Sequence, residues 1–182
     1  MLHHLPNFHN AQGFLGTMLS GWWTGNIMSV QSGYPFNVVN AGSRSQSMAF
    51  SNFADLANRG PSYDKDKVIL GNTDHWFDAS MFELQPLGRL GNAGRNSLRG
   101  PGFYNWDFAL NKDTKFPLLG EAGMLQFRAE VFNILNHPNF ALAKNQQVFT
   151  GTGTRNPTAG AITNIQGGTT PRDIQFALRV TF

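Results

Sequence analysis

The sequence predicts an all-β fold, built as an antiparallel up-and-down meander. Residues 174–182 alternate strictly between apolar and polar side chains, as side chains do along a strand. Similar alternation recurs in two earlier segments that only a short turn separates. The composition agrees: charged residues make up only 14% of the chain, whereas it has 20 glycines and 16 phenylalanines. Turns and wide apolar surfaces therefore dominate over the charged surface of a typical soluble domain.

The closing strand, residues 173–182, has one apolar and one polar wall. Its nine alternating residues are about the length that crosses a bilayer as a tilted β-strand. A soluble sandwich would also use such a strand, with its apolar wall on a core. The apolar wall holds Ile174, Phe176, Leu178, Val180 and Phe182, and the polar wall holds Gln175, Ala177, Arg179 and Thr181.

The first elements are less regular. Residues 1–5 fit the tail of a strand, and residues 6–13 have turn chemistry. We expect an extended segment over residues 17–39, interrupted at Ser32 and Gly33, with Pro35 at a bend or rim. Its alternation is imperfect, with Trp22, Thr24, Asn26, Met28 and Val30 on one face and Trp23, Gly25, Ile27, Ser29 and Gln31 on the other.

Two further strands are predicted over residues 103–116 and 124–135. Helix competes in the second segment, because Arg128, Ala129 and Glu130 are good helix formers. The spacing of its apolar residues at every second position favours a strand. One wall of this pair holds Tyr104, Trp106, Phe108, Leu110, Leu125, Phe127, Ala129 and Val131; the other holds Asn105, Asp107, Ala109, Asn111, Gln126, Arg128 and Glu130.

Connection lengths distinguish between the two architectures. Residues 40–102 and 137–172 lose periodicity and are predicted to be long irregular loops, whereas residues 117–123 form a short turn. Long and short connections therefore alternate along the chain. A membrane barrel has this arrangement, with short periplasmic turns and long extracellular loops, and a sandwich has no reason for it. We therefore predict a segment of a large transmembrane β-barrel over residues 1–182.

Composition excludes several other classes. No run approaches the 18 apolar residues of a transmembrane helix, and the chain has no cysteine for disulfides, thiolate metal sites or a thiol nucleophile. The net charge is +3, but the basic residues alternate with acidic ones, so we expect no nucleic-acid partner. The first residues lack the pattern of a signal peptide. Because an outer-membrane protein needs one, we expect the C-terminal part of a longer protein.

A set of motifs follows in order along the chain. They are Gly21-Trp22, residues 31–36 (QSGYPF), 91–96 (GNAGRN), 99–102 (RGPG), 105–107 (NWD), 127–140 (FRAEVFNILNHPNF) and 172–176 (RDIQF). In these motifs the chain resembles the TonB-dependent outer-membrane receptors, in particular the Oar-like subset with a carboxypeptidase-regulatory-like domain. The resemblance covers nearly the whole chain, from about residue 5 to residue 182. Each motif alone is loose, but their shared order is quite specific.

The resemblance implies the C-terminal portion of a 22-stranded barrel in the outer membrane of a Gram-negative-type bacterium, which takes up substrates. It implies as partners the rest of the barrel, a plug domain absent from this chain, the TonB complex, which would act through the missing N-terminal part, and the barrel-assembly machinery. It also implies that this machinery reads Phe182 as an assembly signal. The alternatives are a non-transporting surface or adhesion barrel and a soluble β-domain.

The barrel prediction assigns a role to each wall. We expect the polar wall to face the lumen, where its side chains pair with one another, with a plug or with substrate, and the apolar wall to contact membrane lipid. The predicted lumen-facing residues are Asn105, Asp107, Arg128, Glu130 and Arg179. The predicted lipid-facing residues are Trp106, Phe108, Phe127, Phe176 and Leu178.

Catalytic and cofactor signals are weak. The segment 88–95 (GRLGNAGR) lacks the phosphate-loop pattern and no helix pattern follows it, so it is predicted to be a loop. Arg89, Arg95 and Arg99 are candidates for contact with an anionic ligand or with lipopolysaccharide phosphates. His3, His4 and His9 lack acidic partners at ligand spacing, and no nucleophile motif surrounds Ser29 or Ser32. We expect no enzyme, no metal and no cofactor.

Overall fold

The chain forms two compact units in a computed structural model, which describes residues 1–6, 13–47 and 54–182. Each unit assembles segments that lie far apart in the sequence. Unit 1 comprises Met1–Val30, Tyr104–Pro138 and Gly168–Phe182, and unit 2 comprises Gln31–Phe103 and Asn139–Gly167.

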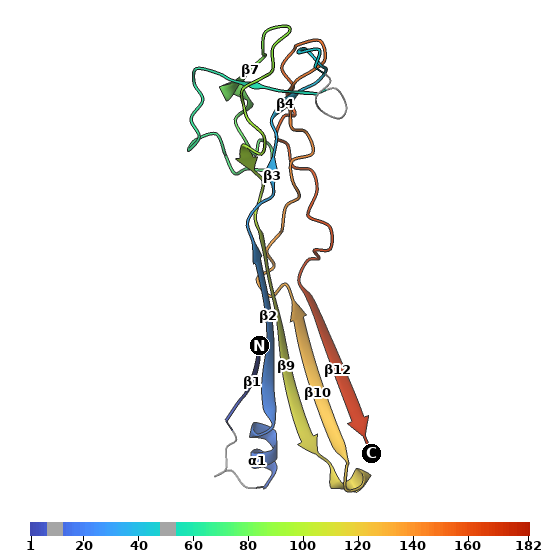
Figure 1. The fold of residues 1–182 in the computed structure, drawn as a ribbon. Helices are drawn as coiled ribbons and strands as arrows, with labels where there is room; N and C mark the ends of the chain where they lie inside the picture. Colours follow the sequence, from blue (N-terminus) through green and yellow to red (C-terminus); the bar gives the residue numbers. More distant parts are fainter. Residues whose placement is uncertain (7–12, 48–53) are drawn as a thin grey trace. The chain divides into compact units, whose positions relative to one another are not determined.

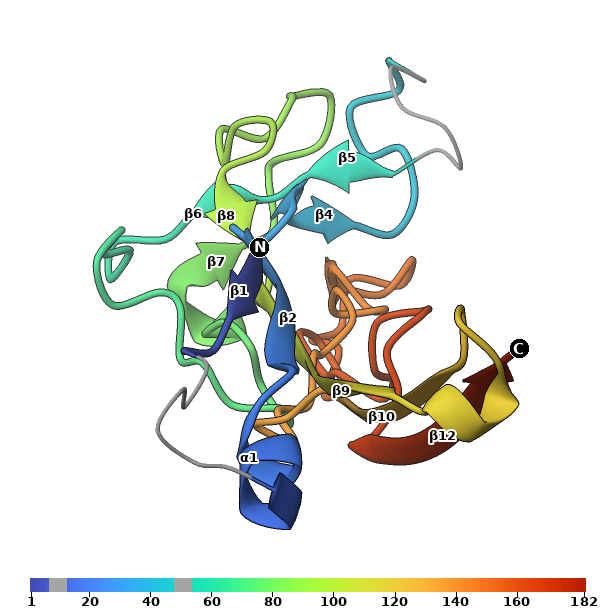
Figure 2. The same cartoon turned by 90° about the horizontal axis from the view of Figure 1, so that it is seen from below.

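Unit 1 is built on a sheet with strand order β1-β2-β9-β10-β12 (Figure 1). The pairs β1–β2, β9–β10 and β10–β12 are antiparallel, and the arrows of β2 and β9 point in opposite directions in Figure 1. Seen along the strands, these elements follow one another across the sheet (Figure 2). The strands are β1 (Leu2–His4), β2 (Trp22–Gln31), β9 (Phe103–Lys115), β10 (Met124–Phe132) and β12 (Asp173–Thr181).

The register gives the sheet one apolar and one polar face. Residues opposite each other on neighbouring strands point to the same side. Phe127 lies opposite Leu178 on β12 and Lys112 on β9, whereas Arg128 lies opposite Ala177 and Asn111. The period-two alternation of β9, β10 and β12 is therefore in phase across all three strands, and the predicted walls are the two faces of one continuous sheet.

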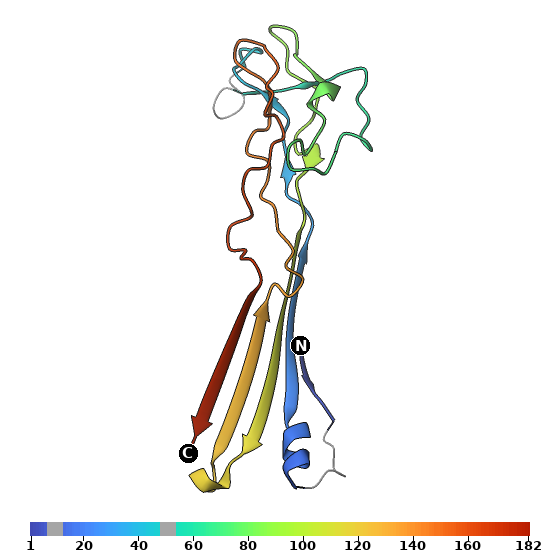
Figure 3. The ribbon, with the colours of Figure 1, turned by 180° about the vertical axis from the view of Figure 1, so that it is seen from behind.

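Two short helical segments lie at one end of this sheet. The α-helix α1 (Gly13–Leu19) precedes β2, and the 3-10 helix η3 (Pro117–Leu119) lies in the turn between β9 and β10. Figures 1 and 3 place α1 and this turn at the same end of unit 1. Among the described residues, no helix combines the length and the apolar character needed to cross a membrane.

Unit 2 contains only short strands. They form a three-stranded sheet in the order β11-β4-β5 and two two-stranded sheets, β3–β8 and β6–β7. One turn of 3-10 helix, η2 (Ala79–Met81), precedes β7. The strands are β3 (Pro35–Phe36), β4 (Val39–Asn40), β5 (Asp55–Leu56), β6 (Asn58–Arg59), β7 (Phe82–Glu83), β8 (Leu98–Arg99) and β11 (Gln147–Phe149).

A hydrophobic core holds unit 2 together. Phe77 and Phe82 are fully buried and meet edge to face, with ring centroids 6.0 Å apart. Val38, Val68 and Val148 are buried with them. The core therefore draws on residues from both long connections, and their burial supplies the apolar driving force that the short strands alone lack.

Close backbone contact also requires glycine in unit 2. A Cβ on Gly33 would lie 1.8 Å from the carbonyl oxygen of Gly100, and one on Gly91 would lie equally close to the carbonyl oxygen of Leu56. Both distances are far inside van der Waals contact, so only glycine fits at either position.

The structure corrects two of the expected elements. Residues 17–39 do not form one interrupted strand: residues 13–19 are helical, β2 begins at Trp22, and Pro35 starts the short strand β3. The long connections are also not irregular throughout, because their buried apolar residues pack into unit 2. The segment 124–135 is a strand to Phe132, which excludes the helical alternative there. The predicted turn at residues 6–13 falls largely outside the described residues.

Candidate functional site: the polar face of the sheet

The polar face of the unit 1 sheet brings together the lumen-facing residues predicted from the sequence. Asn105 and Asp107 lie on β9, Arg128 and Glu130 on β10, and Arg179 on β12. Arg179 stands opposite Gln126 across the β10–β12 pair. Three groups of hydrogen bonds follow one another along this face.

The first group surrounds Asp107. Its Oδ1 accepts hydrogen bonds from the side chain of Asn105 at 2.9 Å and from the backbone nitrogen of Asn133 at 2.9 Å. Asn133 has a φ of 48°, a left-handed conformation that asparagine tolerates better than most residues. Its side-chain nitrogen donates to the carbonyl oxygens of His137 and Thr170, each at 3.1 Å. Asn133 therefore links the end of β10 to the segment that leads into β12.

The second group is centred on Arg128. Its Nε donates to Asn111 Oδ1 at 3.1 Å, and its guanidinium lies 3.5 Å from a carboxylate oxygen of Glu130. Glu130 and Arg128 occur two residues apart on β10, so both point to the same side of the sheet. The pair is partly exposed, and solvent screening makes its contribution to stability modest.

The third group joins β2, β9 and β10 through Asp113. Its Oδ2 accepts a hydrogen bond from the indole nitrogen of Trp23 at 2.9 Å, and its Oδ1 accepts one from Gln126 at 2.8 Å. Trp23, Asp113 and Gln126 were not among the predicted site residues. Asp113 follows Asp107 at even spacing, so extending the same alternation would have found it.

A groove of about 380 Å³ runs over this polar face. Its lining combines charged and amide side chains with apolar ones, and Asp107, Asn111, Arg128 and Glu130 supply its polar part. Ile27 and Phe132 are among the apolar lining residues. Such a surface can bind a polar segment or solute through hydrogen bonds and ion pairs.

The opposite face of the sheet is apolar and exposed. Phe176 and Leu178 have 72% and 64% of their surface accessible, and Phe127 stacks on Phe176 with ring centroids 6.2 Å apart. Phe108 lies opposite Val131 on this face, and the indole of Trp106 donates to Asn26 at 3.1 Å. An exposed apolar face of this kind is typical of a surface that contacts a membrane or another protein.

A known family combines these two faces. A family model described as an outer membrane beta barrel domain matches residues 1–175. The chain belongs to this family. The chain is therefore an all-β protein of the outer membrane. No curated protein and no solved structure matches the chain at a significant level.

The outer-membrane barrel family explains why one sheet has two such different faces. In these barrels the outward face carries an apolar band toward lipid, whereas the interior is polar. The alternation across β9, β10 and β12 follows that rule. Direct lipid contact of Trp106, Phe108, Phe127, Phe176 and Leu178 stays a prediction, as does a lumenal role for the polar set.

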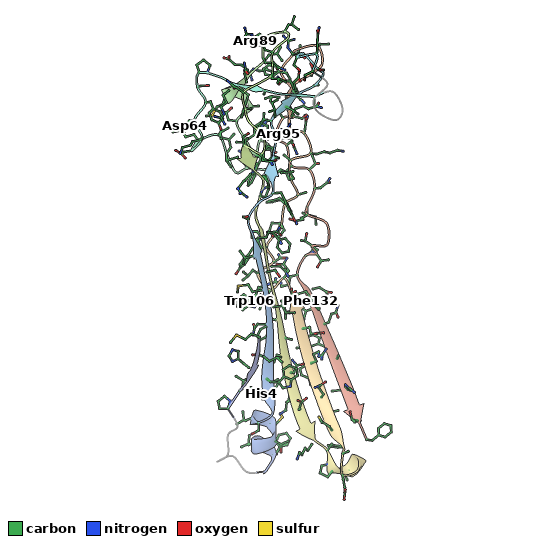
Figure 4. All side chains as sticks on the ribbon, in the orientation of Figure 1. His4, Asp64, Arg89, Arg95, Trp106 and Phe132 are labelled. Atoms are coloured by element: carbon green, nitrogen blue, oxygen red, sulfur yellow. The ribbon has the colours of Figure 1, made fainter. Side chains whose placement is uncertain are left out.

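The three arginines proposed to contact anions all lie in unit 2. Arg89 and Arg95 lie apart within that unit (Figure 4). Arg99 has a structural role, because its guanidinium donates to the carbonyl oxygen of Gly33 at 3.2 Å. Contact with an anionic ligand or with lipopolysaccharide stays a prediction, and Arg89 and Arg95 would make it at separate places.

The remaining predicted residues fall at the edges of unit 1. Phe182 follows β12 and is 90% exposed, and its reading by assembly machinery stays a prediction. His4 contacts the ring of Trp23, with centroids 6.4 Å apart, and His9 lies outside the described residues. Within residues 1–6, 13–47 and 54–182, no three histidine or acidic side chains gather as metal ligands would.

Proposed function

We propose that this domain forms part of the barrel wall of a TonB-dependent outer-membrane receptor of the Oar-like subset, which takes up a substrate across the outer membrane. In this receptor the polar face lines the lumen and contacts a plug domain. The chain has no catalytic role in this proposal. TonB complex, plug and assembly machinery are its proposed partners.

The observation that supports this proposal is that the resembling motifs contact one another. Within unit 2, residues 31–36 and 99–102 meet as the β3–β8 pair, and the nitrogen of Gly100 donates to the carbonyl oxygen of Tyr34 at 2.9 Å. Residue Arg99 also reaches Gly33. The motif glycines and arginine are thus required by one local fold rather than scattered by chance.

The same holds for the motifs of unit 1. The nitrogen of Ile134 donates to the carbonyl oxygen of Trp106 at 2.9 Å, and Asp107 accepts from Asn133. The backbone nitrogen of Arg172 donates to Asn136 Oδ1 at 3.1 Å. Motifs that are far apart in the sequence therefore form one joint where β9, β10 and β12 meet their long connections.

The open edges of the sheet favour a larger barrel. Within the described residues, β1 and β12 each have a strand on one side only. Open edges do not occur in the hydrocarbon layer, and outer-membrane barrels have at least about eight strands. The five strands seen here need further strands to close, and a receptor barrel with a plug supplies them.

Site-specific photocrosslinking in native outer membranes tests the proposal. A photoreactive phenylalanine analogue at Ala109, which lies opposite Glu130 on the polar face, should crosslink to a plug segment. The same analogue at Leu110, the next residue on β9, should crosslink to lipid. Adducts of Ala109 with lipid would overturn the lumenal assignment.

An uptake assay then distinguishes a transporting receptor from a non-transporting adhesion barrel. Cells without TonB should lose accumulation of whichever nutrient the intact receptor supports, while the amount of receptor in the membrane stays unchanged. A barrel that gives no plug adduct from Ala109, and whose loss changes only attachment to surfaces, would instead be a non-transporting adhesion protein.

A further inference from the structure

Helix α1 exposes a continuous apolar surface. Its apolar side chains occur at spacings of one, three and four residues, which place them on one side of a helix. No residue of α1 is buried, and none of its seven residues is charged. The exposed side chains are Phe14 (75% accessible), Leu15 (66%), Met18 (51%) and Leu19 (46%).

The C-terminal end of α1 is fixed to the sheet by two side chains. The last carbonyl oxygens of a helix lack partners within it. Lys112 Nζ donates to the carbonyl oxygens of Thr17 at 2.6 Å and Ser20 at 2.7 Å. The indole of Trp22 donates to the carbonyl oxygen of Met18 at 2.9 Å. The helix is therefore a docked element rather than a fraying end.

The backbone next to α1 adds to this docking. Gly21 has a φ of 80°, and a Cβ there would lie 2.3 Å from the carbonyl oxygen of Asp113. The nitrogen of Asp113 donates to the carbonyl oxygen of Gly21 at 2.9 Å. The chain thus passes from α1 into β2 at a fixed point against β9.

Lys112 also shows on which side of the sheet α1 lies. It lies opposite Phe127 and is therefore on the apolar face, and its ammonium lies 5.2 Å from the ring centre of Trp22. The helix therefore lies on the apolar side of the sheet, at the end where the β9–β10 turn lies (Figures 1 and 2). Because the ammonium of Lys112 donates to the carbonyl oxygens at the end of α1, the apolar face carries no unpaired charge at this position.

We propose that α1 is an interfacial anchor, which lies in the phospholipid leaflet next to the short turns and continues the lipid-facing surface of the sheet. Short turns mark the periplasmic side of such barrels. Because α1 carries no charge, its binding is apolar and independent of anionic lipid. The anchor depends on the membrane location of the domain, not on uptake.

Spin labelling tests the anchor without a background, because the chain has no cysteine. Full-chain variants Leu15→Cys, Leu178→Cys and Glu121→Cys are purified, labelled with a nitroxide and reconstituted into phospholipid vesicles. Depth is then measured from collisions with oxygen and with a water-soluble nickel chelate. Leu178 is the lipid reference, and Glu121, in the β9–β10 turn, is the aqueous reference at the same end.

We expect the Leu15 label about 5–10 Å below the headgroup boundary, the depth typical of interfacial helices. The Glu121 label should remain accessible to the chelate. Equal chelate accessibility at Leu15 and Glu121 would overturn the proposal, whereas a failure of uptake would leave this result unchanged.

The docking residues provide a second test. Lys112→Met keeps the apolar stem but removes the donor to the carbonyl oxygens of Thr17 and Ser20, so the Leu15 label should gain mobility. Trp22→Phe removes the indole donor but keeps an aromatic ring, and should loosen α1 less. Unchanged mobility in both variants would show that neither side chain holds the helix in the leaflet.

Discussion

Phe127 on β10 stands opposite Leu178 on β12, and its ring stacks on Phe176, which also lies on β12. These three side chains lie near the middle of their strands, on the apolar face. If that face meets lipid, the centre of this cluster lies close to the middle of the bilayer. A polar or charged substitution in this cluster should therefore lower the stability of the barrel more than one elsewhere on the face.

A charge at Leu178 should destabilise the assembled barrel. Leu178→Arg places a guanidinium in hydrocarbon, at a cost of about 2–4 kcal/mol near the bilayer midplane. The matched control is Gln175→Arg, on the polar face of the same strand and opposite Glu130, where the new charge gains a partner. Denaturant unfolding of the barrel in lipid vesicles, together with outer-membrane yield, measures both. A silent Leu178→Arg beside a damaging Gln175→Arg would mean that the faces are reversed.

Asn133 should act as a joint between β10 and β12. Asn133→Gly keeps the left-handed backbone but removes the side-chain hydrogen bonds to the carbonyl oxygens of His137 and Thr170. Both acceptor residues are exposed, so water replaces the lost donor and each bond should cost about 0.5–1.5 kcal/mol. Asn133→Ala should cost about 1–2 kcal/mol more, because alanine is strained in that conformation. The measurements are unfolding midpoints and hydrogen exchange over residues 168–173. Equal losses for glycine and alanine would show that the backbone relaxes.

Period-two alternation made the sheet of unit 1 predictable. The strands β9, β10 and β12 were expected within a few residues of their observed ends, and the residues expected to share a wall do share a face. This works because every second side chain must meet the same environment along the whole strand. Lys112 is a charged residue on the apolar face and so departs from the pattern. The structure explains it, because Lys112 donates to a carbonyl oxygen of α1, which is far away in the sequence.

Unit 2 could not be predicted in the same way. Its strands are two or three residues long, too short for any period, and core residues such as Val38, Phe77 and Val148 come from both connections. Their contacts are set by the tertiary fold. Helix α1 was missed because a seven-residue apolar run with two glycines has neither length nor a capping signal.

The contact between Gly33 and Gly100 should make unit 2 sensitive to a single methyl group. Gly33→Ala forces a Cβ into the carbonyl oxygen of Gly100, and such overpacking costs about 1–3 kcal/mol. Gly151→Ala is the matched control, since a Cβ there meets nothing within 4 Å. Limited proteolysis of unit 2 in intact membranes should accelerate only in the first variant. Equal cleavage rates would show that the β3–β8 contact can shift without loss.

The alternation of connection lengths predicts which end of the sheet faces outward. Both long connections leave the same end of unit 1, because β2 and β10 run one way and β9 and β12 the other. Outer-membrane barrels place long connections outside and short turns in the periplasm. An epitope inserted next to Leu87, which is 74% exposed in unit 2, should therefore bind antibody on whole cells. The same epitope at Glu121, in the β9–β10 turn, should bind only after permeabilisation. Both insertions lie in exposed turns, so yield should fall equally and the comparison rests on access alone. Antibody binding to the Glu121 epitope on intact cells would invert this topology, and with it the assignment of α1 to the periplasmic leaflet.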